Sequence, residues 1–243
     1  CCSIGFLTEK QARMLYDAGL DRINHNLNSS RAYYSHICST HTFDQRVENI
    51  HMLQKIGFEI CSGGIIGMGE SKEDVVDMLI ELREIQPEAL PINFLLPIKG
   101  TPLGDKDISG LTTEYCMKVP ALQADGSQSD IRCAAGREVY FKGEEKKLLS
   151  VVDSIFAPVI AAGGQGIQDT IKTIEDAGFT YEMNLHKAFN HAEYHENAPQ
   201  VLLSANIDKS MGINLTDKRK QLPFLLGIND GINQGLLLFL ITP

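Results

Sequence analysis

The sequence lacks several features that would place it in other classes of protein. It contains no tryptophan, and only 7% of its 243 residues are aromatic. No apolar run approaches the roughly 18 residues that a membrane-spanning helix needs. The longest candidate runs only from Leu236 to Ile241. Basic residues are also scarce, 22 against 31 acidic ones. The resulting net charge of −9 argues against nucleic acid as a partner.

The six cysteines form no paired C-x-x-C blocks, which argues against a structural zinc site. A disulfide framework is a poor interpretation for a chain this long, so we expect a reducing, cytoplasmic compartment. The chain begins Cys-Cys-Ser, without an initiator methionine or a targeting pattern. We therefore expect it to be part of a longer protein, whose targeting segment, if any, would precede these residues.

What the sequence does contain is a repeated order of capped amphipathic helix, glycine and apolar strand. Thr8 with Gln11, and Thr42 with Gln45, have the spacing of capping boxes, and Gly57 follows the second apolar stripe. Strands are expected over 22–27, 59–66, 90–98, 130–135 and 151–157, with helices beginning after Thr8, Thr42 and Ser71 and another over 167–177.

Strands that start roughly 20 to 40 residues apart are typical of βα units in a parallel sheet. Polar or small residues stand where these strands end, at Asn26, 62–64, Asn93 and Arg132. The active site of a (β/α) barrel lies at that edge. A doubly wound sheet has the same spacing, so the periodicity alone leaves both architectures open.

Two segments interrupt the pattern. After Met117 a helix is expected, yet Pro120 and the turn signal over 125–127 oppose one. Beyond about Met183 the βα order disappears. We therefore predict two parts, an α/β part over residues 1–182 and a tail of unknown structure over residues 183–243.

Several strings are highly specific when they occur together in this order. They are Asn24-His-Asn-Leu27, Cys61-Ser-Gly-Gly-Ile-Ile-Gly-Met-Gly-Glu70, Pro91-Ile-Asn-Phe94, Lys99-Gly-Thr-Pro-Leu103 and Ile131-Arg-Cys-Ala-Ala-Gly-Arg137. With these strings the chain closely resembles the biotin synthase family of radical SAM enzymes. The resemblance covers residues 1–182, with interruptions near 119–130 and 158–161. It implies a partial (β/α)8 TIM-type barrel, here about the C-terminal five to six βα units.

The resemblance also implies an activity, the insertion of sulfur into dethiobiotin to give biotin. In the family, a 4Fe–4S cluster cleaves S-adenosylmethionine to a 5′-deoxyadenosyl radical, and a 2Fe–2S cluster supplies the sulfur. It further implies a homodimer that is served by sulfur-donor and electron-donor proteins. Neither nucleic acid nor a membrane is expected as a partner.

For the 2Fe–2S cluster the resemblance implies three ligands in this chain: Cys1, Cys61 and the unusual arginine Arg132. Cys2 is expected to be a bystander. A small core residue is the alternative for Cys61, and a salt-bridged barrel residue is the alternative for Arg132. Cys38, Cys116 and Cys133 are expected to be structural.

Asn26 and Asn93 match positions that hold the ureido group of dethiobiotin and the S-adenosylmethionine moiety. Amides that cap strand ends are the alternative for both. Asn28 stands where many members carry a carboxylate for a ribose diol, and this departure weakens the expected contact. The pattern Gly63-x-Ile65-x-Gly67-x-x-Glu70 resembles the stretch whose backbone lies against the adenine, and a plain glycine-rich turn is its alternative. No residue is assigned as a catalytic acid or base.

The C-x-x-x-C-x-x-C motif that binds the 4Fe–4S cluster does not occur in the chain. We therefore expect the isolated chain to be inactive, and to aggregate through unpaired strand edges. The interruptions near 119–130 and 158–161 suggest local reading-frame slips. Two other functions stay open, a related radical SAM barrel enzyme and an inactive remnant whose tail binds a partner. His186, His191 and His195 in that tail are expected to lie on a solvated face rather than to bind a metal.

Overall fold

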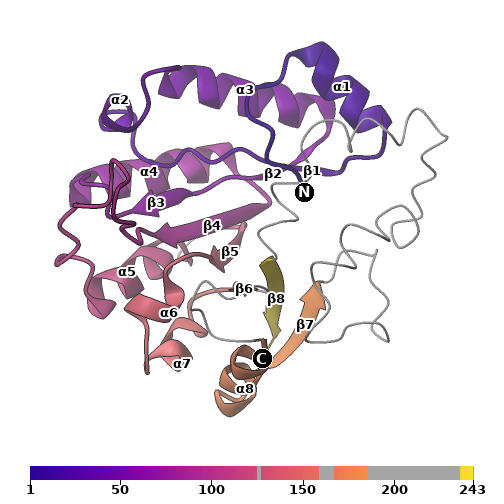
Figure 1. Ribbon diagram of the computed structural model, residues 1–243. Coiled ribbons are helices and arrows are strands. Elements are labelled where there is room, and N and C mark those ends of the chain that lie inside the picture. Colours follow the sequence, from indigo (N-terminus) through magenta and orange to yellow (C-terminus); the bar gives the residue numbers. More distant parts are fainter. Residues whose placement is uncertain (125–126, 159–166, 185–235, 243) are drawn as a thin grey trace.

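The computed structural model describes residues 1–124, 127–158, 167–184 and 236–242, and its centre is a curved, mostly parallel sheet (Figure 1). The strands pair in the order β1-β2-β4-β5-β6-β8-β7, and β3 also pairs with β4. Their bounds are β1 Arg22–Asn24, β2 Glu59–Cys61, β3 Gly64–Ile66, β4 Ala89–Phe94, β5 Asp130–Cys133, β6 Ser154–Pro158, β7 Thr180–Asn184 and β8 Leu236–Thr242.

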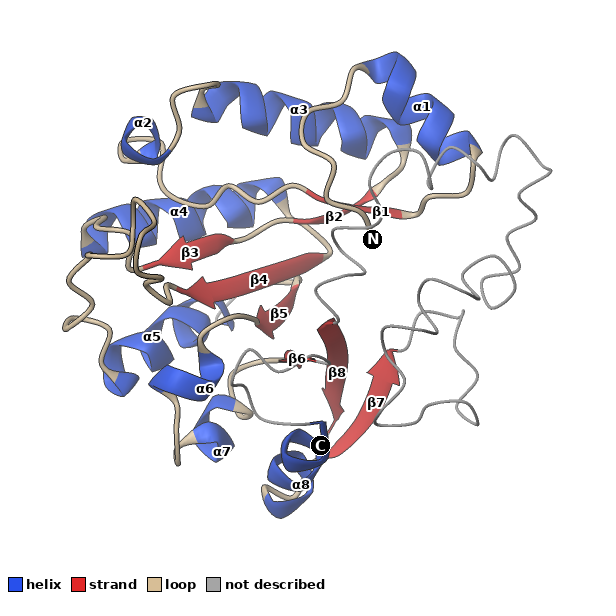
Figure 2. Ribbon diagram, viewed as in Figure 1, coloured by secondary structure: helices blue, strands red, loops and turns tan. Residues whose placement is uncertain are grey.

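The helices lie along the outer, convex side of the sheet (Figures 1 and 2). They are α1 Glu9–Asp17, α2 Tyr34–Ile37, α3 Phe43–Ile56, α4 Lys72–Ile85, α5 Thr113–Ala124, α6 Arg137–Tyr140, α7 Glu145–Leu148 and α8 Ile167–Asp176. The capping boxes predicted at Thr8 and Thr42 are formed, and Ser71 forms a third with Asp74. Gly57 ends α3 at φ 112°, a left-handed conformation that glycine adopts without strain.

Strands β1, β2 and β5 alternate between an apolar outer face and a largely polar inner face. Ile23, Ile60, Ile131 and Ile155 point outward and are at most 3% exposed in the core beneath the helices. The residues beside them along the same strands point inward and are largely polar. Because the helices of the described residues cover one face only, the sheet is a partial barrel, whereas a doubly wound sheet carries helices on both faces. The α/β fold class is confirmed.

The strand expected over 59–66 is two short strands, β2 and β3, separated at Ser62 and Gly63. Both pair with β4, through Cys61 opposite Ala89 and Gly64 opposite Ile92. Pro91 lies on β4 across from the break. Because proline has no N–H to donate, the ladder of hydrogen bonds cannot continue through this point.

The sequence predicts that the helix is broken after Met117, and this prediction is wrong. Helix α5 continues through Pro120 to Ala124, and both Val119 and Pro120 are buried. Proline removes the hydrogen bond to the carbonyl of Cys116, but the apolar side chains of α5 pack against the sheet at β5. Tertiary burial therefore overrides the local preference. Several strands are also shorter than predicted, since β1 ends at Asn24 and β4 ends at Phe94.

The end of the chain adds β7 and β8 to the sheet. Strand β8 runs antiparallel to both β6 and β7 and lies between them. The predicted boundary after residue 182 falls inside β7. The interruption expected near 158–161 falls largely on residues 159–166, which lie outside the described part. His186, His191 and His195 also lie outside the described residues. Among the residues that are described, no helix is long and apolar enough to cross a membrane.

Candidate functional site

Cys61 is the last residue of β2, and its side chain lies on the inner face of the sheet. It is 4% exposed. Asn24, its partner in the neighbouring strand β1, donates from Nδ2 to the Cys61 Sγ at 3.4 Å. The thiol is therefore buried next to a polar donor rather than among apolar core side chains, which favours a functional over a purely structural cysteine.

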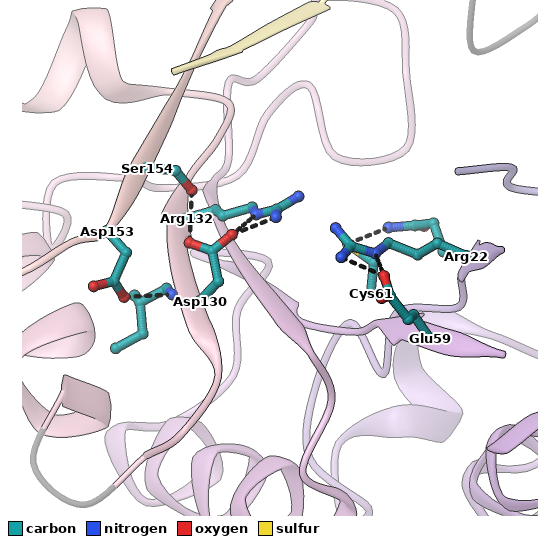
Figure 3. A network of polar contacts seen from close by, with 9 residues as sticks. Arg22, Glu59, Cys61, Asp130, Arg132, Asp153 and Ser154 are labelled. Atoms are coloured by element: carbon teal, nitrogen blue, oxygen red, sulfur yellow. Dashed lines mark hydrogen bonds and ion pairs between the residues drawn. The ribbon is translucent and has the colours of Figure 1, made fainter. Parts of the chain in front are cut away.

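Two pairs of arginine and carboxylate lie on the same face, on either side of Cys61 (Figure 3). Arg132 of β5 donates from Nε to Asp130 Oδ2 at 2.7 Å, and its Nη2 also contacts this oxygen. Arg22 of β1 donates from Nε to Glu59 Oε2 at 2.7 Å across the strand pair. The tertiary structure thus brings together Cys61 and Arg132, two of the predicted cluster ligands, from strands 71 residues apart in sequence.

Burial raises the pKa of the Cys61 thiol above its ordinary value of 9.0. The hydrogen bond from Asn24 and the positive charges of Arg132 and Arg22 oppose this effect and lower the pKa. Arg132 is thus close enough to Cys61 to stabilise its thiolate. A thiolate is the form that binds iron, so the site is suited to a metal cluster that displaces the thiol proton.

The position of Cys1 follows from the backbone pairing of its neighbour Cys2. Cys2 forms a parallel bridge with Ile23, and its backbone N–H donates to the carbonyl of Arg22 at 3.1 Å. Because side chains alternate along extended chain, Cys2 shares the outward face of Ile23, and Cys1 shares the inner face of Arg22. Within the described residues no three His, Cys, Asp or Glu side chains converge as a metal site. Cys1 therefore stays a prediction as a ligand.

The three other cysteines lie elsewhere, and none of the six forms a disulfide. Cys116 and Cys133 are at most 1% exposed, and burial raises the pKa of each to about 12. Cys133 follows Arg132 on β5 and faces the outer core. Cys38 is partly exposed, and a hydrogen bond from Thr40 lowers its pKa.

The residues predicted to bind nucleoside and substrate meet at the carboxyl ends of β1 to β4. Asn26 accepts at Oδ1 from the N–H of Gly63 at 3.1 Å. Asn28, at φ 70°, exchanges backbone hydrogen bonds with Gly63 and Ile65 at 3.0 Å each. Glycine is required at position 63, because an added Cβ would overlap the carbonyl oxygen of Pro91.

Asn93 and Glu70 complete this edge. Asn93 donates from Nδ2 to the carbonyl of Gly64 at 3.1 Å and accepts at Oδ1 from the N–H of Ala135 at 3.2 Å. Glu70 accepts from the N–H of Gly67 at 2.6 Å, and its Oε2 is buried without a hydrogen-bond partner. The amides therefore join neighbouring strands, while the second oxygen of Glu70 keeps an unused acceptor position.

Sequence reasoning did not assign Arg22, Asn24 and Asp130, which lie near the Cys61 thiol. It also missed Ser154, which donates to the carboxylate of Asp130. A signal was present in the strands themselves. Arg22, Asn24 and Asn26 are polar at every second position, as are Asp130 and Arg132. A parallel sheet buried on both faces reads as continuously apolar, so this alternation marks a polar barrel interior.

His25 lies between two residues of the site but faces the outer core, where it is 2% exposed. The Phe6 ring contacts it edge-on at 5.1 Å, and Arg46 and His41 add positive charge nearby. Burial, followed by these two charges, lowers the pKa of His25 from 6.5 to about 4. Folding therefore keeps the imidazole neutral.

We expect this histidine to make the fold sensitive to acid. Between about pH 6.5 and pH 4 the unfolded chain binds a proton that folded His25 does not, so stability falls as the pH is lowered through this window. The total loss is about 3 kcal/mol. Urea unfolding at a series of pH values should give a flatter profile for His25→Leu than for the wild type. The exposed His51→Leu is the control, and equal slopes for the wild type and His25→Leu would contradict the expectation.

Comparison with known proteins agrees with this geometry. Residues 1–82 match the Radical SAM superfamily, and residues 91–180 match the Biotin and Thiamin Synthesis associated domain. The one-sided parallel sheet and these two matches define a radical SAM barrel protein that carries the associated domain.

Individual relatives narrow the class. The chain is 44% identical over 158 residues to biotin synthase of Sulfurihydrogenibium sp. (strain YO3AOP1), covering 65% of this chain and 47% of the relative. It is 40% identical over 185 residues to biotin synthase 2 of Frankia casuarinae, covering 75% of this chain and 51% of the relative. For biotin synthase of Magnetococcus marinus the identity is 40% over 184 residues, covering 75% and 57%. Over the residues matched, the chain is therefore similar to biotin synthases.

The chain spans about half the length of these curated relatives. Among solved structures, methylornithine synthase (PylB) matches 54% of this chain and 39% of its own, with 19% identity and a TM-score of 0.47.

Proposed function

We propose that these residues form the substrate and sulfur-donor half of a biotin synthase, which converts dethiobiotin to biotin. The observation that carries the proposal is the meeting of Cys61 and Arg132 on the inner face of the sheet, both at most 6% exposed. A buried thiol beside a buried guanidinium, in a chain related to biotin synthases, is suited to a 2Fe–2S cluster with an arginine ligand.

Cys61 and Arg132 would hold this cluster, together with Cys1 from the same face. When bound, the iron–sulfur clusters supply the electron that cleaves S-adenosylmethionine and the sulfur atom that enters the product. The protein residues have simpler tasks. Asn24 and the two arginines favour the thiolate of Cys61, and the closely packed strands keep water away from it.

At the carboxyl ends of the strands, Asn26, Asn28 and Asn93 would orient dethiobiotin and S-adenosylmethionine. Their amides retain donor and acceptor capacity beyond the bonds described above. The backbone of Gly63, Ile65 and Gly67 would lie against the nucleoside, and Glu70 would accept a hydrogen bond from it at Oε2. The reaction adds one sulfur in place of two hydrogens, so it requires a sulfur donor, and the reductive cleavage of S-adenosylmethionine requires an electron donor. We assign the homodimer of the family as the working assembly.

The test is an anaerobic assay of the protein expressed from the complete open reading frame that encodes these 243 residues. With S-adenosylmethionine, reductant and dethiobiotin, we expect biotin to form and S-adenosylmethionine to be consumed. Cleavage of S-adenosylmethionine without biotin would indicate a different radical SAM enzyme. If the protein binds neither iron nor S-adenosylmethionine, it is an inactive relative, and the proposal fails.

A further inference from the structure

Asp130 stands two residues before Arg132 on β5, so both side chains lie on the inner face of the sheet. One carboxylate oxygen, Oδ2, accepts from both Nε and Nη2 of Arg132. The other oxygen, Oδ1, accepts from Ser154 Oγ at 3.0 Å. Ser154 lies on β6 directly opposite Arg132, and it is fully buried. The carboxylate is therefore held from two strands (Figure 3).

This arrangement fixes the plane of the guanidinium group. Two of its three nitrogens are occupied by Asp130, and the third, Nη1, takes part in neither bond. Figure 3 shows the guanidinium directed from β5 toward Cys61 and Arg22. An arginine side chain has many rotamers, so a fixed partner for Nε and Nη2 is what keeps Nη1 on the Cys61 side.

We propose that Asp130 is the positioning residue for Arg132, with Ser154 holding the carboxylate in place, so that Nη1 is presented to the cluster. The inference rests on the proposed function, because a cluster is what would use that nitrogen. It also explains why arginine suits this position better than lysine, whose single ammonium cannot bind Asp130 with one nitrogen and offer another.

The second arginine beside Cys61 provides an internal comparison. Arg22 pairs with Glu59, but their side chains are 25% and 50% exposed, against 8% and 23% for Arg132 and Asp130. A pair this exposed orders its arginine weakly. Glu59→Gln is therefore the matched control, since it removes the acid partner of an arginine near the same thiol without touching Arg132.

The first measurement uses the metal-free form of the protein expressed from the complete open reading frame. The Nε–H of Arg132 is identified by its loss in Arg132→Lys, and its hydrogen exchange is then followed by NMR. In Asp130→Asn we expect exchange to be about tenfold faster, the factor that the loss of a charge-assisted hydrogen bond predicts. Ser154→Ala should give a smaller change in the same direction, and Glu59→Gln none. Unchanged exchange in an Asp130→Asn protein that remains folded would overturn the inference.

The second measurement follows the cluster after anaerobic reconstitution with ferrous iron and sulfide. Asp130→Asn should retain iron and sulfide but alter the visible circular dichroism of the cluster, whereas Glu59→Gln should keep the wild-type spectrum. Identical spectra for Asp130→Asn and wild type would overturn the inference while leaving the proposed function intact. If the wild type takes up no cluster, the proposed function fails and the presentation of Nη1 to a cluster fails with it.

Discussion

Replacing Cys61 by alanine should remove the 2Fe–2S cluster from the protein encoded by the complete reading frame, with a loss of about two irons per chain. The reason is the position of the thiol, which is buried on the inner face between Asn24 and the two arginines. No other described cysteine of this chain shares that inner position at the end of β2. Iron and acid-labile sulfide analysis and the visible spectrum measure the loss directly.

The control for Cys61→Ala is Cys133→Ala. Cys133 is also buried, at 1% exposed, and the same atoms are removed, but its side chain faces the outer core. Cys133→Ala should cost stability without changing the iron content. If Cys61→Ala keeps the full cluster, or if both variants lose it equally, Cys61 is a core residue, as one interpretation of the sequence allows.

Replacing Gly63 by alanine should destabilise the fold by about 3 kcal/mol or more. An added Cβ would overlap the carbonyl oxygen of Pro91 and lie 2.8 Å from its carbonyl carbon. This backbone cannot move aside easily, because β4 is paired on its other side with β5 through Pro91 and Arg132. The same substitution would displace the N–H that Gly63 donates to Asn26.

Urea unfolding of Gly63→Ala and Gly110→Ala gives the comparison. Gly110 has nothing within 4 Å of an added Cβ and does not adopt a positive φ, so alanine there should be neutral or stabilise by up to about 1 kcal/mol. Equal unfolding midpoints for the two variants would show that β4 yields to the added methyl group. The close approach of Gly63 to Pro91 would then have no energetic consequence.

Local signals in the sequence determined much of the secondary structure. The capping boxes at Thr8 and Thr42 and the glycine at position 57 act within one helical turn, so their consequences follow from neighbouring residues alone. The strings around Cys61 and Arg132 likewise identified the family without knowledge of their spatial relation. The α/β class followed from the spacing of strands and helices.

Other features depend on partners that are distant in sequence. The break between β2 and β3 arises because Pro91, almost thirty residues further on, cannot donate a hydrogen bond. Helix α5 passes through Pro120 because its apolar side chains find a buried place against β5. The periodicity of strands and helices is the same in a barrel and in a doubly wound sheet, so it could not distinguish them. The described helices lie on one face of the sheet, and this observation identifies the partial barrel.

The features of the site also fall into those that the local sequence determines and those that depend on distant partners. The sequence by itself determined which residue types could bind a cluster, since thiols and an unusual arginine can be recognised from their motifs. Only the tertiary structure decided that Asn24, Arg22 and the Asp130–Arg132 pair surround the thiol of Cys61. The physical reason is that strand register sets these contacts, and register results from the packing of the whole sheet rather than from any single segment.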